Sequence, residues 1–435
     1  MKIKNKYKIL IYIIIGLALA IRLAYVIKMP YTEKQHDIGE VGDGHDGLDY
    51  IFTIYETGHL PQDNIGQHYH PPLHQIICAM FLKIISIFNT DVNFMCESLQ
   101  FVTLMYSMAL VFIIYKILQE LHIKEKYKML AMIVVAFHPT LIILSGSLNN
   151  DCLCLTLTIW TILRLIKWYK KDNIKNTILL AIITGLCVMA KTSGAIVAIP
   201  IMYIFLLKLY RKVKKSENKI LVIKKYMYLF IFFGCISLPI GLWYPIRNYI
   251  EFKQPILYVM DPHNSDLYVG NYMLLQRFLP FSNEINQMYC DPWNQYNIPI
   301  FLLKCSLFGE YSWNTNGIFK VLYVVSILAN IYLIIQTLYC IISQMLNKTK
   351  RTKQWKIAFL LLFIFNIFSY ITMNIKLPYG CTMDFRYIAS TVFTGTMFVI
   401  FEMQSIKQTI IIYNIITLTV IMCLSADTIL LLSQV

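Results

Sequence analysis

Acidic and imidazole side chains are concentrated in one stretch of this chain, residues 31–75, which reads YTEKQHDIGEVGDGHDGLDYIFTIYETGHLPQDNIGQHYHPPLHQ. Its acids are Glu33, Asp37, Glu40, Asp43, Asp46, Asp49, Glu56 and Asp63, and its histidines are His36, His45, His59, His68, His70 and His74. Carboxylates and imidazoles are the groups that most often move protons in enzymes. Apolar runs flank the stretch, and ionisable groups beside a membrane indicate catalysis or ion handling more than packing.

Two of these acids are candidate general bases. Asp37 in QHDIG follows shortly after the first apolar run, and Asp46 lies in GHDGLDY. A carboxylate that is partly shielded from water has a raised pKa and can accept a proton from an incoming hydroxyl. The alternative is that these acids only solvate an external loop.

The motif YHPPLH, residues 69–74, predicts a rigid helix start, because proline is well tolerated in a first helical turn. His70 and His74 then lie about one turn apart, where they could transfer a proton or contact a ligand. His68 is close enough in sequence to leave a zinc site as an alternative, but the extended residues before the prolines and the helix after them do not share one face. We therefore expect no metal ligand and no metal cofactor.

The motif SGSLNND, residues 145–151, places Asn149, Asn150 and Asp151 at the mouth of a predicted span. Asn and Asp are good helix caps, which is the simpler explanation. The same amides and carboxylate could instead bind sugar hydroxyls or hold a catalytic geometry.

Three cations lie at the outer face of the predicted topology: Lys191 in MAKTSG, Arg247 in WYPIRN and Arg386 in MDFRY. Arginine suits a bidentate phosphate contact and lysine a point-charge contact, so the set favours an anionic headgroup. Lys and Arg at a membrane face also serve as interfacial anchors, which stays an alternative here.

The elements that position these groups are membrane helices. The chain has 435 residues, of which 57% are hydrophobic and 14% charged, against about 25% charged in soluble domains. Apolar runs reach or approach the roughly 20 residues that cross a bilayer and lack the alternation of barrel strands. The sequence thus predicts an all-α polytopic membrane protein with one domain, residues 1–435. The predicted spans are 9–28, 100–118, 127–145, 152–168, 177–190, 193–208, 226–246, 317–342, 357–373, 388–403 and 409–432.

Basic connections sort to one side of these spans, so the amino terminus is predicted to be cytoplasmic. The net charge of +15 follows from that sorting, and no nucleic-acid partner is expected. Two large external loops result, residues 29–99 and 247–316. Residues 72–88 are apolar, and we expect a re-entrant or interfacial helix there. Residues 191–194 interrupt two short runs, as in the broken helices that line binding sites.

In chain order, these motifs resemble those of the polytopic glycosyltransferases of the GT-C fold. The resemblance rests on the acidic first loop, TGHLP followed by HPPLH, LNND, GLCVMAKTSG, PIGLWYPIRN, FGEYSW and MDFRYI, which extend over nearly the whole chain. It is specifically to the protein-O-mannosyltransferase-like branch (glycosyltransferase family 39), which is similar to the lipid A aminoarabinose transferases. The resemblance implies a GT-C-like bundle of about eleven transmembrane helices with interfacial helices and two external loops.

It also implies inverting transfer of a sugar from a polyprenyl-phosphate donor at the outer membrane face. The bias of the composition to Ile, Lys and Asn indicates an AT-rich bacterial genome, so the membrane is predicted to be a bacterial plasma membrane. The acceptor would be a glycan, a lipid or a protein, with membrane lipids around the bundle. No cofactor is expected, because the sequence has no glycine fingerprint for a pyridine or flavin nucleotide. The family places an Asp-Glu pair in the first loop, whereas this chain has His36-Asp37 and His45-Asp46. Asp37 is nearer the membrane, and Asp46 has Tyr50 four residues on, as the family signature has.

By the same resemblance, Asp151 matches the acid at the later span mouth, and Lys191, Arg247 and Arg386 match positions suited to the donor phosphate. We expect the remaining substrate contacts from His36, His45, Tyr50, His70, His74 and Asn150. The alternatives are a transporter or lipid flippase, which the broken helices would suit, and a polytopic scaffold or sensor without catalysis.

Overall fold

The computed structural model describes residues 2–32, 39, 41, 46–256, 258–260, 265–311, 316–346, 352–405 and 409–432. Its α-helices are α1 (Lys2–Lys28), α2 (Gly47–Thr57), α3 (Leu73–Ile85), α4 (Val92–Glu120), α5 (Glu125–Phe137), α6 (Pro139–Ile143), α7 (Asp151–Lys170), α8 (Ile174–Ala190), α9 (Ala198–Lys215), α10 (Lys219–Phe252), α11 (Leu274–Phe278), α12 (Ile298–Phe308), α13 (Ile318–Leu346), α14 (Lys353–Lys376), α15 (Ser390–Ser405) and α16 (Thr409–Leu432). Short 3-10 helices are η1 (Gly66–Tyr69), η2 (Thr192–Val197), η3 (Asn283–Asn286), η4 (Gly380–Met383) and η5 (Phe385–Ile388). The predicted all-α class is confirmed.

A helix occupies each of the eleven predicted spans. Eight helices in the described part of the chain are long and apolar enough to cross a membrane, so the chain is a multi-pass membrane protein. The number eleven itself is not established, because α8 is shorter, α15 is not among the eight, and the span predicted at 127–145 is broken into α5 and α6.

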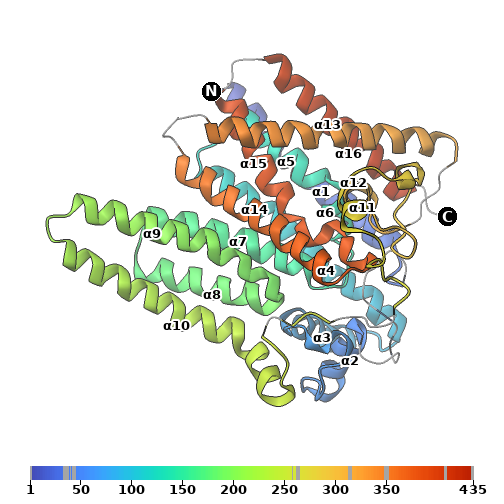
Figure 1. Cartoon of the computed structure of the whole chain (residues 1–435), viewed down its shortest axis with the longest axis horizontal. Helices are drawn as coiled ribbons and strands as arrows, with labels where there is room; N and C mark the ends of the chain where they lie inside the picture. Colours follow the sequence, from blue (N-terminus) through green and yellow to red (C-terminus); the bar gives the residue numbers. More distant parts are fainter. Residues whose placement is uncertain are drawn as a thin grey trace.

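Figure 1 shows the arrangement of the bundle. Helix α8 packs between α7 and α10, and these helices with α9 form one side of the molecule. Helices α13, α15 and α16 pack together on the other side, with α14 bridging to α9. Helix α3 packs on α4 and meets α8, so it holds the first predicted loop against both helices.

The break between α8 and α9 is the one that the MAKTSG motif predicts. Lys191 has an extended backbone (φ −159°, ψ 136°) between α8 and η2. A Cβ on Gly194 would lie within 2.5 Å of the Cys187 carbonyl oxygen, so the chain can turn back this closely only with glycine. The side chain of Lys191 is thereby presented where two helical segments meet.

The break between α5 and α6 was not predicted, although Pro139 is its cause. Proline has no N–H to donate to the carbonyl four residues earlier, that of Val135. The fully buried guanidinium of Arg22 takes that place, donating to the Val135 oxygen at 2.9 Å and the Ala136 oxygen at 2.5 Å. Arg22 Nε also donates to Ser107 Oγ at 2.8 Å, which ties α1 to α4 and α5.

Both segments predicted as external loops, residues 29–99 and 247–316, contain helices. Helix α3 has 13 residues and rises about 20 Å, less than the roughly 30 Å of a hydrocarbon core, as expected for a helix that does not cross. In the second loop, α12 is an apolar helix of 11 residues packed against α6 and α13. The sequence prediction had this segment as a plain loop.

Candidate active site

A polar cavity of about 390 Å³ lies where the first external loop covers the break at Lys191. Asp46 and His74 line it from the first loop, Asn150 and Asp151 from the start of α7, and Lys191 from the break. Its remaining wall comes from Tyr258, Val259, Met260 and Leu267, and from α14, η4 and η5. Residues far apart in sequence therefore share one chamber.

The charged centre of the site is Asp151 with two cations. Lys191 Nζ lies 2.5 Å from Asp151 Oδ1, and Arg386 Nε lies 3.6 Å from Asp151 Oδ2. The Lys191 and Asp151 side chains are 13% and 8% exposed. Asp151 therefore contacts both cations, and with Asp384 beside Arg386 the cluster has two carboxylates for two cations. A smaller cavity that adjoins the first one is lined by both Asp151 and Arg386.

Neighbouring groups hold the two cations in place. Asp384 accepts a hydrogen bond from the Arg386 backbone N–H at 2.8 Å, and its other oxygen lies 3.4 Å from Arg386 Nε. The Tyr387 ring contacts both cations, with Lys191 Nζ 4.8 Å and Arg386 Cζ 5.0 Å from its centroid. Asp384 and Tyr387 flank Arg386 in the sequence, and the DFRY motif was the signal that could have identified them.

Asp46 lines the same cavity from the start of α2. It occupies the N-cap position, but its side chain makes no capping hydrogen bond. A Cβ on Gly39 would overlap the Asp46 carboxylate, so this glycine is what leaves room for the side chain. Asp46 is therefore the carboxylate that the first loop brings into the cavity among the described residues. Asp37, His36 and His45 lie outside those residues.

The histidines of the first loop have separate environments. His74 is buried, and its Nε2 donates to the Leu148 carbonyl at 2.7 Å. Burial lowers the pKa of His74 from 6.5 to about 4, so its ring is neutral at physiological pH. His68 Nδ1 is 2.7 Å from Asp63 Oδ1, and His70 lines the cavity.

Within the described ranges, no group of three or more His, Cys, Asp or Glu is arranged to hold a metal ion. The zinc alternative through His68, His70 and His74 therefore finds no support in this geometry, since His68 and His74 have the separate partners given above. The expected absence of a cofactor stays a prediction.

Three of the expected contact residues that the structure describes do not line this cavity: Arg386, which lines the smaller adjoining one, and Tyr50 and Arg247. The Tyr50 hydroxyl is 3.0 Å from the Tyr244 hydroxyl and 3.2 Å from the His70 carbonyl, so it ties α2 to α10 and the HPP segment. Burial, with Tyr244 beside it, raises the pKa of Tyr50 and keeps it neutral. Arg247 pairs with Glu251 at 2.8 Å and donates to the Pro61 carbonyl at 2.9 Å. Arg247 therefore anchors the first loop on α10.

The amides of the LNND motif lie in the cavity wall. Asn150 precedes α7 but makes no side-chain capping bond. The Nδ2 atoms of Asn149 and Asn150 are buried, and neither has a hydrogen-bond partner in the structure. The helix-cap explanation therefore does not account for Asn150.

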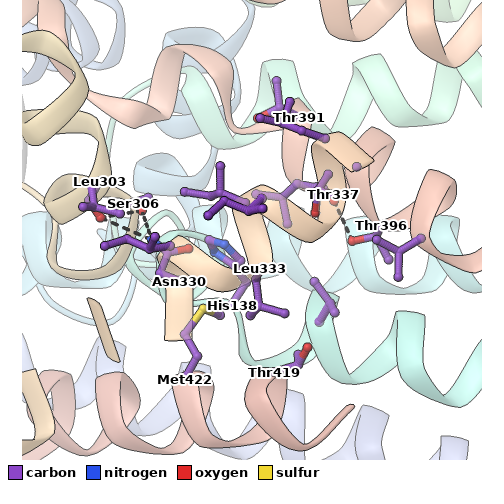
Figure 2. A pocket seen from close by; sticks show the side chains of 18 of the residues that line it. His138, Leu303, Ser306, Asn330, Leu333, Thr337, Thr391, Thr396, Thr419 and Met422 are labelled. Atoms are coloured by element: carbon purple, nitrogen blue, oxygen red, sulfur yellow. Dashed lines mark hydrogen bonds between the residues drawn. The ribbon is translucent and has the colours of Figure 1, made fainter. Parts of the chain in front are cut away.

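A second cavity, of about 450 Å³, lies within the bundle and is almost entirely apolar (Figure 2). It runs between α5, α12, α13, α14, α15 and α16, and Figure 2 shows His138, which follows α5, with Leu333 of α13 and Met422 of α16 around it. Of its few polar groups, Asn330 is satisfied by Ser306 Oγ at 2.9 Å and the Leu303 carbonyl. Phe385 lines this cavity, whereas Arg386 and Tyr387, the next two residues, line the polar ones.

Comparison of the sequence with known families supports the reading of these motifs. Residues 69–240 match the family model described as dolichyl-phosphate-mannose-protein mannosyltransferase. The resemblance is confirmed. The matched region includes Asp151, Lys191 and the HPPLH motif, whereas Asp46 and Arg386 fall outside it. No curated protein sequence gives a significant match.

The fold is similar to that of an oligosaccharyltransferase from Archaeoglobus fulgidus. The structure of that enzyme tethered by a disulfide to an acceptor peptide with the NVT sequon gives a TM-score of 0.50 at 12% identity, covering 98% of this chain and 55% of that one. The archaeal enzyme AglB in complex with an inhibitory peptide and a dolichol-phosphate gives 0.48 at 11% identity, covering 99% and 56%. The chain thus spans just over half the length of that protein. At this identity the likeness concerns the fold, and the GT-C-like architecture is confirmed.

Proposed function

We propose that this chain is a membrane glycosyltransferase that moves a sugar from a polyprenyl-phosphate carrier to an acceptor hydroxyl at the extracytoplasmic face of a bacterial plasma membrane. One observation carries the proposal: Asp46 from the external loop shares a cavity with the Asp151–Lys191 ion pair, beside Arg386. Displacement of a phosphate leaving group needs two things, a proton acceptor and cationic hydrogen-bond donors that contact the phosphate. The family model, whose description names a dolichyl-phosphate sugar, supports the donor class.

In this mechanism Asp46 takes the proton of the acceptor hydroxyl as its oxygen attacks the anomeric carbon of the donor. The bond from that carbon to the phosphate oxygen breaks with its electron pair going to the phosphate, so the configuration inverts. General-base assistance of this kind contributes about 10²- to 10⁴-fold in rate. Asp37 remains a candidate for the same role.

Lys191 and Arg386 would bind the phosphate as negative charge grows on it. Asp151 does not compete for this role, because one ion pair uses only part of the three donors of a lysine and the five of an arginine. Instead, Asp151 fixes the position of both cations before the donor arrives. Preorganised charge is most effective where charge develops during the reaction.

The apolar cavity of Figure 2 supports a carrier with a long hydrocarbon chain. Phe385 lines that cavity, and the adjacent Arg386 lines the polar side. A lipid phosphate at Arg386 would have its chain within reach of an apolar lining.

The test is sugar transfer by the purified full-length chain in detergent, with polyprenyl-phosphate mannose as the probe donor and product formation followed by mass spectrometry. Replacing Asp46 and Asp37 separately by asparagine should leave one variant with a loss of about 10²-fold or more in kcat. Asp49→Asn is the control, because Asp49 lies on α2 but does not line the cavity. Full activity in both variants would refute the assigned base, and lipid scrambling without any product would favour a flippase.

A further inference from the structure

The polar cavity contains a set of buried amide groups that the mechanism above does not use. Gln75 and Asn150 are each 5% exposed, and both line the cavity with Asn149. Gln75 Oε1 and the Nδ2 atoms of Asn149 and Asn150 have no hydrogen-bond partner in the structure. Leaving a buried polar atom unsatisfied costs about 1–3 kcal/mol, so three of them in one wall indicate a ligand that satisfies them.

The three amides are held close to one another. His74 Nε2 donates to the Leu148 carbonyl at 2.7 Å, which joins α3 directly to the LNND segment. Gln75 follows His74 and Asn149 follows Leu148, so both amides lie next to this contact. Asn149 Oδ1 accepts from the Asp151 backbone N–H at 3.1 Å. That bond fixes which end of the Asn149 amide is the oxygen and leaves its NH₂ group toward the cavity.

The three unsatisfied groups are one acceptor, Gln75 Oε1, and two donors, the NH₂ groups of Asn149 and Asn150. A matching ligand group must therefore both donate and accept hydrogen bonds. A hydroxyl group both donates and accepts, and can therefore satisfy Gln75 Oε1 as well as the asparagine NH₂ groups. An ammonium group only donates and a carboxylate only accepts, so either leaves part of the set unmet. The charged groups of the cavity do not alter this, because Lys191 and Asp151 are paired with each other and Asp46 serves the acceptor.

We propose that Gln75, Asn149 and Asn150 are specificity-determining residues that bind hydroxyls of the donor sugar, and that the sugar transferred is therefore neutral, without an amino or carboxylate substituent at these positions. This inference rests on the proposed function. The amides adjoin Asp151 and Lys191, next to the expected phosphate, which is why the donor sugar and not an acceptor sugar is their ligand.

The test measures donor binding by the full-length protein in detergent, with Asp46→Asn present so that the donor is not consumed. The probes are polyprenyl phosphate, polyprenyl-phosphate mannose, its single-deoxy analogues and a polyprenyl-phosphate amino-deoxy sugar. The mannose donor should bind tighter than bare polyprenyl phosphate, and at least one deoxy analogue and the amino sugar should each bind about 5- to 150-fold weaker than mannose. Asn150→Leu should abolish the difference between mannose and the deoxy analogue that lacks its partner hydroxyl.

Gln75→Glu gives a second, gain-of-function arm, because a carboxylate in place of the amide should favour the amino sugar by tenfold or more relative to mannose. Gln344→Leu is the control for Asn150→Leu, since it also places leucine at a buried side-chain amide: Gln344 is 2% exposed on α13 and does not line the cavity. It should bind every probe like the parent protein.

Equal affinity for mannose, deoxy and amino donors would overturn the inference, as would an Asn150→Leu effect confined to the KM of the acceptor in the active protein. If bare polyprenyl phosphate binds but no sugar adds affinity, the inference fails while the proposed function stands. If no polyprenyl phosphate binds at all, the proposed function fails with it.

Discussion

Replacing Lys191 by methionine tests the central charge of the site. The substitution keeps the length of the side chain and removes its charge. Asp151 then retains Arg386 at 3.6 Å, so its buried carboxylate is not left without a cation. We therefore expect a protein that folds and binds lipid but transfers sugar slowly.

The expected loss follows from the charge that the donor phosphate gains. A phosphodiester carries a charge of about −1 and a phosphate monoester about −1.5 to −2 at neutral pH. A full unit of charge at about 4 Å from an ammonium is worth about 4 kcal/mol at an effective dielectric constant of about 20. With half to all of that charge present in the transition state, Lys191→Met should raise the barrier by about 2–4 kcal/mol, or lower kcat roughly 30- to 1,000-fold.

Lys208→Met is a matched control. Lys208 is 12% exposed, pairs with Asp172 at 3.2 Å and lies 4.7 Å from the centroid of the Tyr169 ring. Lys191 likewise pairs with one carboxylate, Asp151, and lies over one ring, that of Tyr387. Along η2 and α9, residues 191 to 208 are roughly 25 Å apart, so Lys208 is remote from the cavity. Asp172 keeps a hydrogen bond from the Tyr226 hydroxyl in that variant.

The assay is single-turnover transfer from polyprenyl-phosphate mannose at saturating donor, with thermal unfolding measured on the same samples. Both variants should unfold at similar temperatures, and Lys191→Met alone should be slow. A Lys191→Met protein with parental kcat, or a Lys208→Met protein equally impaired, would refute the argument that Lys191 stabilises the leaving phosphate.

Three further outcomes are expected. Asp46→Asn should lower kcat by about 10²- to 10⁴-fold with little change in donor KM, whereas Asp49→Asn should leave kcat unchanged. An unchanged kcat in Asp46→Asn would show that Asp46 is not the general base. Arg22→Met should lower the unfolding temperature in detergent, because two buried carbonyls at the end of α5 lose their donor at about 1–3 kcal/mol each, and Arg22→Lys should restore part of the loss. The pKa of His74 is about 4 in the folded state and about 6.5 in the unfolded state, so protonation at low pH favours the unfolded state. The free energy of unfolding should therefore keep its full value above pH 6.5 and fall by up to about 3 kcal/mol as the pH drops to 4. Denaturation measured across that range should show a weaker pH dependence for His74→Gln.

Much of the fold could be predicted from the sequence, because hydropathy reports directly on bilayer burial. Each predicted span coincides with a helix, and the MAKTSG motif correctly located the break at Lys191. The break at Pro139 was also readable in principle, since proline cannot complete a helix interior. Its buried partner Arg22, more than a hundred residues earlier, was not, because hydropathy carries no information on which helix a charge faces.

The site was predictable by residue type but not by partner. The sequence indicated that Asp151, Lys191 and Arg386 were unusual, yet nothing local showed that one carboxylate holds both cations. Arg247 has the same local features and instead pairs with Glu251 on α10. Gln75 was not singled out, and its signal was only its position beside His74 in the HPPLH helix.

The cavity is assembled from segments near the two ends and the middle of the chain, and the middle segment alone matches the family model. Of the four charged groups of the site, Asp151 and Lys191 lie within that segment, whereas Asp46 and Arg386 lie outside it. A homologue could preserve the recognisable central region and the bundle and yet have lost its outer acid or its arginine. To distinguish active enzymes from inactive paralogues, the residues at positions 46 and 386 therefore have to be inspected as well as the matched region.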